Sequence, residues 1–370
     1  MSYEQAILPI GQRSFSEDDL VSVLCIGDPH FKKNNARLTD AMHEAILAKV
    51  KEVEYDMVVI LGDTLHDHEA TTSGAFCRAL DFIEDILDHA PVTLLIGNHD
   101  MVNNQVWMGE HSGPAGKFRK TKSAHFFSGL HRWNHTDGGR LTIVDRPTPI
   151  EVNEVVWISA VPYVENGRLV EALDNSGEWQ QSALVVAHQE IKGCKHGAFI
   201  SEDGDEWKPE WPLLISGHIH EKQSVGDNVY YPGTPVQHAF GDGANKGLLA
   251  LHLQTDGSWE REEIPLGIRG KLTIKTSAAD LDKVTFKRDA DYRVVITGDA
   301  VELKGVMSSP LVKEWIEDGV KVVTKVDKVT SESAPRVVNS VERVSYRDAV
   351  RQRVVERPDL LTILDSVLRE

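Results

Sequence analysis

Five short segments rich in Asp, Asn and His follow five runs of aliphatic and β-branched residues in the first 220 positions of this chain. The apolar runs span residues 21–26, 58–61, 92–96, 184–186 and 213–215. Such runs predict buried strands, and open α/β sheets place their ligand sites at the carboxyl ends of the strands. The repeated pattern therefore predicts one site assembled from five separate parts of the chain.

The five polar segments each offer side chains that bind metals. They read Gly-Asp-Pro-His at 27–30, Gly-Asp-Thr-Leu-His-Asp at 62–67, Gly-Asn-His-Asp at 97–100, Ala-His at 187–188 and Gly-His-Ile-His at 217–220. Any one of them alone is more often a turn or an accident of strand alternation. Five together, in this order and each at a strand end, favour a metal site.

The segments between these strands predict helices and one long loop region. Leu38, Met42, Ile46 and Val50 recur at helical spacing, and a second helix begins near residues 71–73, which are good N-cap types. Strands separated by helices of this length imply right-handed βαβ crossovers, hence an α/β fold. Residues 101–135 lack periodicity and predict a functional loop beside the site.

The chain is long enough for more than one domain, since 370 residues exceed the size of a typical single core. The pattern changes near residues 266–270. We expect an N-terminal arm at 1–20, a metal-bearing domain at 21–268, a small α+β unit at 269–330, and a linker with amphipathic helices at 331–370.

The composition bears on the cellular location of the protein and on whether it can bind nucleic acid directly. No apolar run is long enough to span a membrane, the N-terminus lacks a basic leader pattern, and the three cysteines form no CxxC pair. We expect a cytoplasmic protein with reduced thiols. The net charge of −17 does not suit direct binding of nucleic acid, so that binding would need local positive charge or a partner.

The polar residues match the needs of two divalent ions, which together can activate a water and neutralise a phosphoryl group. Asp63, at the tip of the central strand, is the natural bridge between them. The other candidates form two sets: Asp28 and His30 with one imidazole of the His218 and His220 pair, and Asn98 and His188 with the other. Mixed nitrogen and oxygen ligation without thiolate favours Mn, Fe or Zn.

The motif order D-x-H, G-D-x-x-H, G-N-H-D, H and G-H-x-H resembles the calcineurin-like metallophosphoesterase superfamily. The resemblance implies a four-layer fold, a β-sandwich of two sheets flanked by helices, and it implies two ligand sets. These are Asp28, His30, Asp63 and His220 for one ion, and Asp63, Asn98, His188 and His218 for the other. It further implies that His99 contacts the phosphate and leaving group and that Asp100 orients His99.

Within that superfamily, the chain is similar to SbcD-type DNA-repair nucleases and their counterparts from tailed phages. It lacks the Asp-Arg-Gly of protein phosphatases and has His66, which corresponds to a second imidazole of the SbcD type. Residues 216–220, 231–235 and 241–242 also resemble that type. The resemblance implies that 21–268 is the nuclease domain, that 269–330 is a capping domain, that 331–370 docks on the coiled coil of an SbcC-type ATPase, and that the chain forms a homodimer.

The expected function is therefore that of a metal-dependent DNA exonuclease or endonuclease, with two ions, most simply Mn²⁺ and otherwise Fe, Zn or Mg. It would act on DNA ends, duplex or single strands, in a bacterial cell or phage-infected host. A basic cluster in the predicted loop, Lys117, Arg119, Lys120 and Lys122, is either a DNA contact or a solvated surface. The alternatives are a small-molecule or cyclic-nucleotide phosphodiesterase and a non-catalytic interaction module.

Overall fold

The structure is a computed structural model that describes residues 19–68, 70–102, 125–132, 139–152, 156–197, 199–254, 258–287 and 290–326. All of these except Val326 belong to one compact unit, which ends at Lys325. Residues 1–18 of the expected N-terminal arm, the basic cluster at 117–122, most of the loop region at 101–135 and the helices at 331–370 fall outside the described residues, while residues 19 and 20 of that arm begin the first strand.

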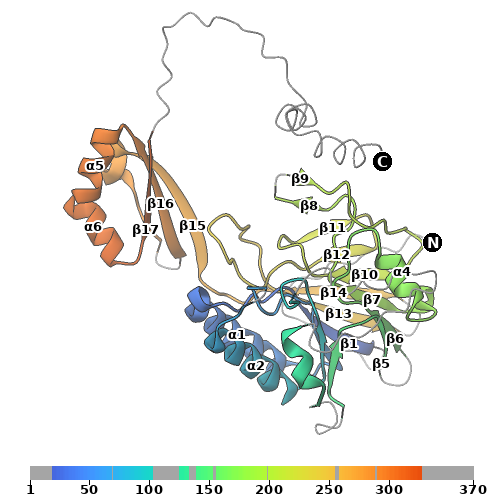
Figure 1. Cartoon of the computed structure of the whole chain (residues 1–370). Helices are drawn as coiled ribbons and strands as arrows, with labels where there is room; N and C mark the ends of the chain where they lie inside the picture. Colours follow the sequence, from blue (N-terminus) through green and yellow to red (C-terminus); the bar gives the residue numbers. More distant parts are fainter. Residues whose placement is uncertain are drawn as a thin grey trace, which may run out of the picture. The chain divides into compact units, whose positions relative to one another are not determined.

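Two six-stranded sheets form the centre of the described chain (Figure 1). The first has the order β14 (Trp259–Ile264), β13 (Leu248–Gln254), β1 (Asp19–Ile26), β2 (Met57–Ile60), β3 (Val92–Leu95) and β4 (Leu141–Val144). The second has the order β11 (Gln223–Val225), β12 (Val229–Tyr231), β10 (Leu213–Ser216), β7 (Leu184–Ala187), β6 (Val156–Ala160) and β5 (Thr148–Val152).

The alternation of side chains along β1 shows why the sheets stack. Val23 and Cys25 point into a core that both sheets share, whereas Leu24 and Ile26 point into a core beneath the helices. Successive strand residues face opposite sides of a sheet, so a strand buried on both sides needs an unbroken apolar run. The runs recognised in the sequence are therefore the central strands of a sandwich.

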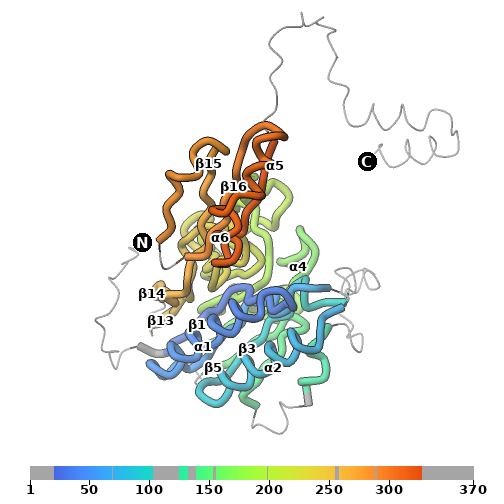
Figure 2. The backbone as a smooth tube through the Cα atoms, turned by 90° about the vertical axis from the view of Figure 1, so that its left-hand side faces the viewer, coloured from blue at the N-terminus to red at the C-terminus, as the bar shows by residue number. Residues whose placement is uncertain are grey.

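Helices cover the outer face of each sheet, which gives the four layers that the resemblance implied. α1 (Ala36–Glu52) and α2 (Ser73–Leu87) lie side by side on the first sheet, as Figures 1 and 2 show. The N-cap of α2 is Thr72, whose hydroxyl accepts a hydrogen bond from Ala75 N. α4 (Leu169–Asp174) packs Leu169 and Leu173 against the second sheet.

The start of α4 is set by the glycine that precedes it. Gly167 adopts a left-handed φ of 84°, which is incompatible with a helix at that position. The backbone therefore turns there, with Arg168 N donating to Glu165 O, and the helix starts at Leu169.

Residues beyond the sandwich form a third sheet with a hydrophobic cluster of its own. It has the order β15 (Gly270–Ser277), β16 (Ala290–Gly298) and β17 (Lys321–Val326), and it packs against α5 (Ala300–Ser308) and α6 (Pro310–Glu317). This third sheet with its two helices is the small α+β unit that the sequence pattern indicated, and the apolar side chain of Val301 in α5 is 82% exposed. The domain boundary at 268 stays a prediction.

The remaining described elements are short. They are the hairpin β8 (Lys195–His196) with β9 (Phe199–Ile200), and the 3₁₀ turns η1 (Lys33–Asn35), η2 (Phe126–Arg132), η3 (Trp179–Gln181) and η4 (Ala278–Lys283). Among the described helices, none is both long and apolar enough to cross a bilayer.

The topology places the five polar segments together. They follow β1, β2 and β3, which are neighbouring parallel strands of the first sheet, and β7 and β10, which are parallel neighbours in the second. The carboxyl ends of parallel strands lie at one edge of a sheet. Segments up to 190 residues apart consequently come within hydrogen-bonding distance, as between Asp28 and His218.

Candidate metal centre

The first group of candidate ligands comes from the ends of β1 and β10. His30 Nε2 lies 2.9 Å from His220 Nε2, and His220 Nε2 lies 3.7 Å from the Asp28 carboxylate. Asp28 and His30 are each 1% exposed, while the His220 side chain is more open. One carboxylate and two imidazoles thus face a common point, with His220 on the solvent side.

The second group comes from the ends of β2, β3, β7 and β10. Asn98 Oδ1 lies 3.1 Å from His188 Nε2 and 3.0 Å from His218 Nδ1. His188 Nε2 also lies 3.3 Å from Asp63 Oδ1. The structure thus assigns His220 to the group of Asp28 and His30, and His218 to the group of Asn98 and His188. The residue pattern alone left that choice open.

Asp63 lies between the two groups. Its Oδ1 faces His188, and its Oδ2 lies 3.9 Å from His30 Nε2 and 3.9 Å from His99 Nε2. The carboxylate is buried, so its two oxygens cannot reorient freely toward solvent. A carboxylate with one oxygen turned to each ligand group is the arrangement that a bridging ligand requires.

Three candidate ligands have a left-handed backbone, which is costly for residues other than glycine. φ is 50° at His30, 48° at Asp63 and 77° at His218. Such a conformation costs about 1–2 kcal/mol for an L-residue. Hydrogen bonds hold it in place: His30 N donates to Asp63 O at 3.0 Å, and His218 N donates to the Asp28 carboxylate at 3.1 Å.

Two motif glycines are needed because the ligand loops approach each other closely. A Cβ atom at Gly97 would lie 2.2 Å from Asp63 Oδ1, and one at Gly217 would lie 2.4 Å from Leu61 O. No side chain fits at either distance. The glycine before the ligand residue in these two motifs thus has a packing cause.

The charge of each buried ligand depends on the charges of its neighbours. Burial would raise the pKa of Asp63, but His188 and His30 beside it outweigh that effect and hold the pKa well below its usual range. Burial likewise opposes charge on His188, yet Asp63 and Asp28 raise the pKa of His188 to about 9. Without a metal, His188 and Asp63 therefore form a buried ion pair.

His30 and His218 are neutral and keep a lone pair for a ligand. Burial lowers the pKa of His30 well below its ordinary value and that of His218 to about 3. Neutral imidazole, carboxylate and amide oxygen suit a borderline divalent ion such as Mn, Fe or Zn. In both groups the carboxylate and imidazole ligand atoms lie within 4.8 Å of one another, so the residues fit divalent ions.

Two further histidines border the first group. His66 Nδ1 lies 3.3 Å from His30 Nδ1, and the rings of His66 and His99 stack with centroids 5.3 Å apart. The Nδ1 of His99 contacts His66 O, and its ring stacks on His68 at 4.2 Å. His99 Nε2 lies 3.9 Å from the buried Asp63 carboxylate.

Asp100 has partners other than the expected ring of His99. Its carboxylate accepts hydrogen bonds from Thr64 N, Leu65 N and Gly97 N, at 2.9 to 3.3 Å. Burial and the neighbouring Asp63 raise the pKa of Asp100 to about 7. Asp100 therefore positions the loop that carries Asp63, and the contacts of His99 with His66 and His68 orient its ring.

The sequence pattern missed two residues at the centre. His238 Nε2 lies 3.2 Å from Asp28 O, with its ring 5.3 Å from that of His30, and Lys246 donates to His220 O at 2.6 Å. Neither residue follows an apolar run, so the strand-end pattern could not identify them. The proline- and glycine-containing segment at 231–235 was the only nearby signal.

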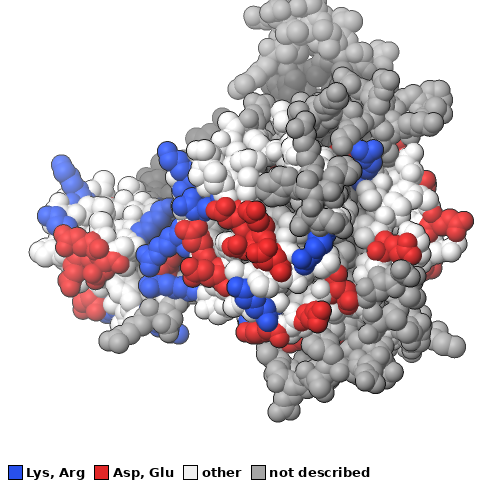
Figure 3. Space-filling view, turned by 90° about the horizontal axis from the view of Figure 1, so that it is seen from below, with Lys and Arg blue, Asp and Glu red and all other residues white. Residues whose placement is uncertain are grey.

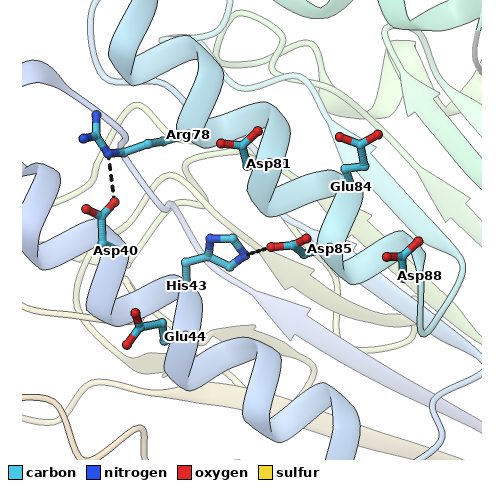
Figure 4. A pocket seen from close by; sticks show the side chains of 8 residues that line it. All are labelled: Asp40, His43, Glu44, Arg78, Asp81, Glu84, Asp85 and Asp88. Carbon is cyan, nitrogen blue, oxygen red and sulfur yellow. Dashed lines mark hydrogen bonds and ion pairs between the residues drawn. The ribbon is translucent and has the colours of Figure 1, made fainter.

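A hollow of about 670 Å³ between α1 and α2 lies apart from these ligands and is strongly acidic (Figure 4). It is lined by Asp40, His43, Glu44, Arg78, Asp81, Glu84, Asp85 and Asp88. Arg78 donates to Asp40 at 2.8 Å, and His43 pairs with Asp85 at 2.9 Å. Figure 3 shows acidic side chains gathered over these helices, so this surface repels a polyanion.

Comparison with known proteins gives one family and several relatives. The model of the calcineurin-like phosphoesterase family matches residues 21–222. "Putative phosphoesterase 078R" of Invertebrate iridescent virus 3 is 33% identical over 349 residues, which cover 92% of this chain and 94% of that protein. "Putative phosphoesterase 244L" of Invertebrate iridescent virus 6 is 33% identical over 304 residues, which cover 80% of this chain and 100% of that protein.

Among solved structures, one titled "GAP50 the anchor in the inner membrane complex of Plasmodium" aligns with a TM-score of 0.33 and 12% identity. The alignment covers 85% of this chain and 98% of that one.

Proposed function

The chain belongs to the calcineurin-like phosphoesterase family, and from that premise we propose that it is a two-metal phosphodiesterase that cleaves DNA, as the nuclease subunit of an SbcCD-like repair and recombination complex. The observation that carries the proposal is the position of His66. Protein phosphatases carry Asp-Arg-Gly in the segment after the bridging aspartate, whereas this chain lacks that motif and has His66 there. The His66 ring lies against both His30 and His99.

The chain's own residues divide the work of phosphodiester cleavage. His99 donates its Nδ1 proton to His66 O, which leaves Nε2 as the atom that exchanges a proton with the substrate. His66 is partly exposed, with Lys32 Nζ 3.4 Å from its Nε2, so both imidazoles can meet a phosphodiester. Two divalent ions, which we propose to be Mn²⁺, would supply an activated water and neutralise charge on the phosphate.

The charge distribution bears on how DNA would reach the centre. The surface over α1 and α2 is acidic, and the whole chain carries a net charge of −17. Phosphate contacts from Lys and Arg supply most of the affinity of proteins for DNA. We therefore propose that an SbcC-type ATPase, docked on residues 331–370, supplies much of the attraction, and that the subunit works as a homodimer.

The decisive experiment measures cleavage of linear duplex DNA and of bis(p-nitrophenyl) phosphate with Mn²⁺, in the parent and in two variants. Asp63→Ala removes the bridging carboxylate and should abolish both activities. Asp81→Ala removes a surface carboxylate of α2 and should change neither. Cleavage of the small diester without cleavage of DNA, even with the ATPase present, would favour the small-molecule alternative. DNA cleavage by Asp63→Ala equal to that of the parent would exclude the proposed site.

A second experiment addresses the partner. Deleting residues 340–370 should abolish co-purification with the co-expressed ATPase while cleavage of bis(p-nitrophenyl) phosphate persists, since no candidate ligand lies in that segment. Retention of the ATPase by the shortened chain would exclude the proposed docking segment.

A further inference from the structure

A third group of metal-ligating side chains lies outside the centre described above. His125 precedes η2, His131 belongs to η2, and Asp145 directly follows β4. One ligand atom from each of them lies within 4.8 Å of the others. None of the three belongs to the five motifs that identified the dinuclear centre.

The distances in this cluster match those between ligands of a single ion. Asp145 Oδ2 lies 2.9 Å from His131 Nε2 and 3.5 Å from His125 Nε2. Atoms bound tetrahedrally to one ion at about 2.0–2.1 Å are roughly 3.3 Å apart. The other carboxylate oxygen, Oδ1, accepts from Arg146 Nε at 3.3 Å, which leaves Oδ2 facing the two imidazoles.

The state of His125 points to a missing partner. Its side chain is 2% exposed, and neither ring nitrogen has a hydrogen-bond partner within the described part of the chain. Buried polar atoms are almost always paired, and an unpaired one destabilises the fold. A cation shared with Asp145 would use the lone pair of His125 Nε2.

We propose that His125, His131 and Asp145 bind one further divalent ion of the Zn²⁺ class. Two imidazoles and one carboxylate form a donor set that this ion prefers, and His131 is the most exposed of the three. The site is independent of the proposed DNA substrate, since none of its ligands belongs to the dinuclear centre.

The position of the site indicates a structural role. His125 pairs with Met101 in an isolated β-bridge, and Phe126 N donates to Asp100 O at 3.1 Å. The chain therefore leaves the Gly-Asn-His-Asp motif after Val102 and returns beside it at His125. An ion held by His125 and Asp145 would fasten this return point to the end of β4, next to His99 and Asp100.

The test counts bound ions. Protein stripped with a chelator is reloaded with Zn²⁺ alone, desalted and analysed for zinc per chain by mass spectrometry. We expect three ions in the parent, two in His131→Ala and three in Arg146→Ala, the control that removes a neighbour of Asp145 but no ligand. His131 lies at the surface end of the cluster, so its replacement leaves the core intact.

A second background separates this site from the dinuclear centre. The Asp63→Ala variant lacks the bridging carboxylate of the dinuclear centre, so it should bind one zinc ion per chain. The double variant Asp63→Ala/His131→Ala should bind none. If His131→Ala binds as much zinc as the parent in both backgrounds, the cluster is only a carboxylate–imidazole pair and the proposal fails. If the parent binds a single ion that depends on His131, this site stands and the proposed dinuclear function fails.

Discussion

The side-chain amide of Gln237 both accepts a hydrogen bond from and donates one to the backbone of Lys271. Lys271 N donates to Gln237 Oε1 at 2.7 Å, and Gln237 Nε2 donates to Lys271 O at 3.3 Å. Lys271 Nζ also donates to Gln237 O at 2.7 Å. Since His238, the residue after Gln237, contacts Asp28 O, this pair connects the start of strand β15 to the loop beside the metal centre.

Replacing Gln237 should separate the cleavage of DNA from that of small diesters. Gln237→Ala removes the two side-chain bonds to Lys271 and one to Asp242 O, each worth about 0.5–1.5 kcal/mol. We expect DNA cleavage to fall roughly tenfold while hydrolysis of bis(p-nitrophenyl) phosphate is kept, because no candidate ligand is changed. Gln223→Ala on β11 is the matched control. An equal loss on both substrates would show that Gln237 supports the centre itself.

Adding a methyl group at Gly97 should damage the centre severely. The Cβ of Gly97→Ala would fall 2.2 Å from Asp63 Oδ1 and 2.3 Å from Asp63 N, so the bridging residue must move. We expect metal binding to weaken at least a hundredfold, measured by calorimetric titration with Mn²⁺, which corresponds to about 3 kcal/mol. Gly305→Ala in α5, where no atom lies within 4 Å of the new Cβ, should bind normally and gain about 0.5–1 kcal/mol in stability. Normal affinity in Gly97→Ala would argue against this packing constraint.

Removing His66 should slow the reaction without emptying the centre. His66→Ala keeps every proposed ligand, so metal content should stay at the parent level, while kcat for bis(p-nitrophenyl) phosphate falls about a hundredfold through the loss of proton transfer and of support for His99. His43→Ala, between α1 and α2, is the control histidine. Loss of metal together with activity would instead make His66 a ligand.

The metal-free protein should lose stability as the pH rises from 6.5 to 9. The pKa of His188 is about 9 in the folded protein and near 6.5 unfolded, so its stabilising charge is fully present below 6.5 and lost as pH rises through 9. His30 and His218 have lowered pKa values and oppose folding only below about 6.5. Urea unfolding in EDTA should show a decrease on the order of 3 kcal/mol across this range.

The matched measurement uses metal-loaded protein. Metal binding requires neutral His188, so the stabilisation that added Mn²⁺ provides should grow with pH over the same range. In His188→Gln the metal-free pH dependence should largely vanish. A parent whose metal-free stability is constant from pH 6.5 to 9 would contradict the buried ion pair with Asp63.

The sequence pattern indicated the candidate ligands because each follows a strand that is apolar on both faces. Asp28, Asp63 and Asn98 stand at such ends, and the fold brings those ends together. The sequence pattern did not predict His238 and Lys246 because both lie in the loop region after β12. The path of a loop is visible only in the folded chain. The cluster at His125 and His131 was hidden for the same reason, inside a region that has no periodicity.

The left-handed backbone at His30, Asp63 and His218 has an evolutionary consequence. A carbonyl oxygen and a carboxylate of the protein accept the hydrogen bonds that hold two of these conformations. A descendant of this chain that exchanged His220, whose side chain holds none of these conformations, for an inert residue would keep the same left-handed loops. A single substitution can therefore abolish catalysis in this fold while its surface stays available for selection as a binding site.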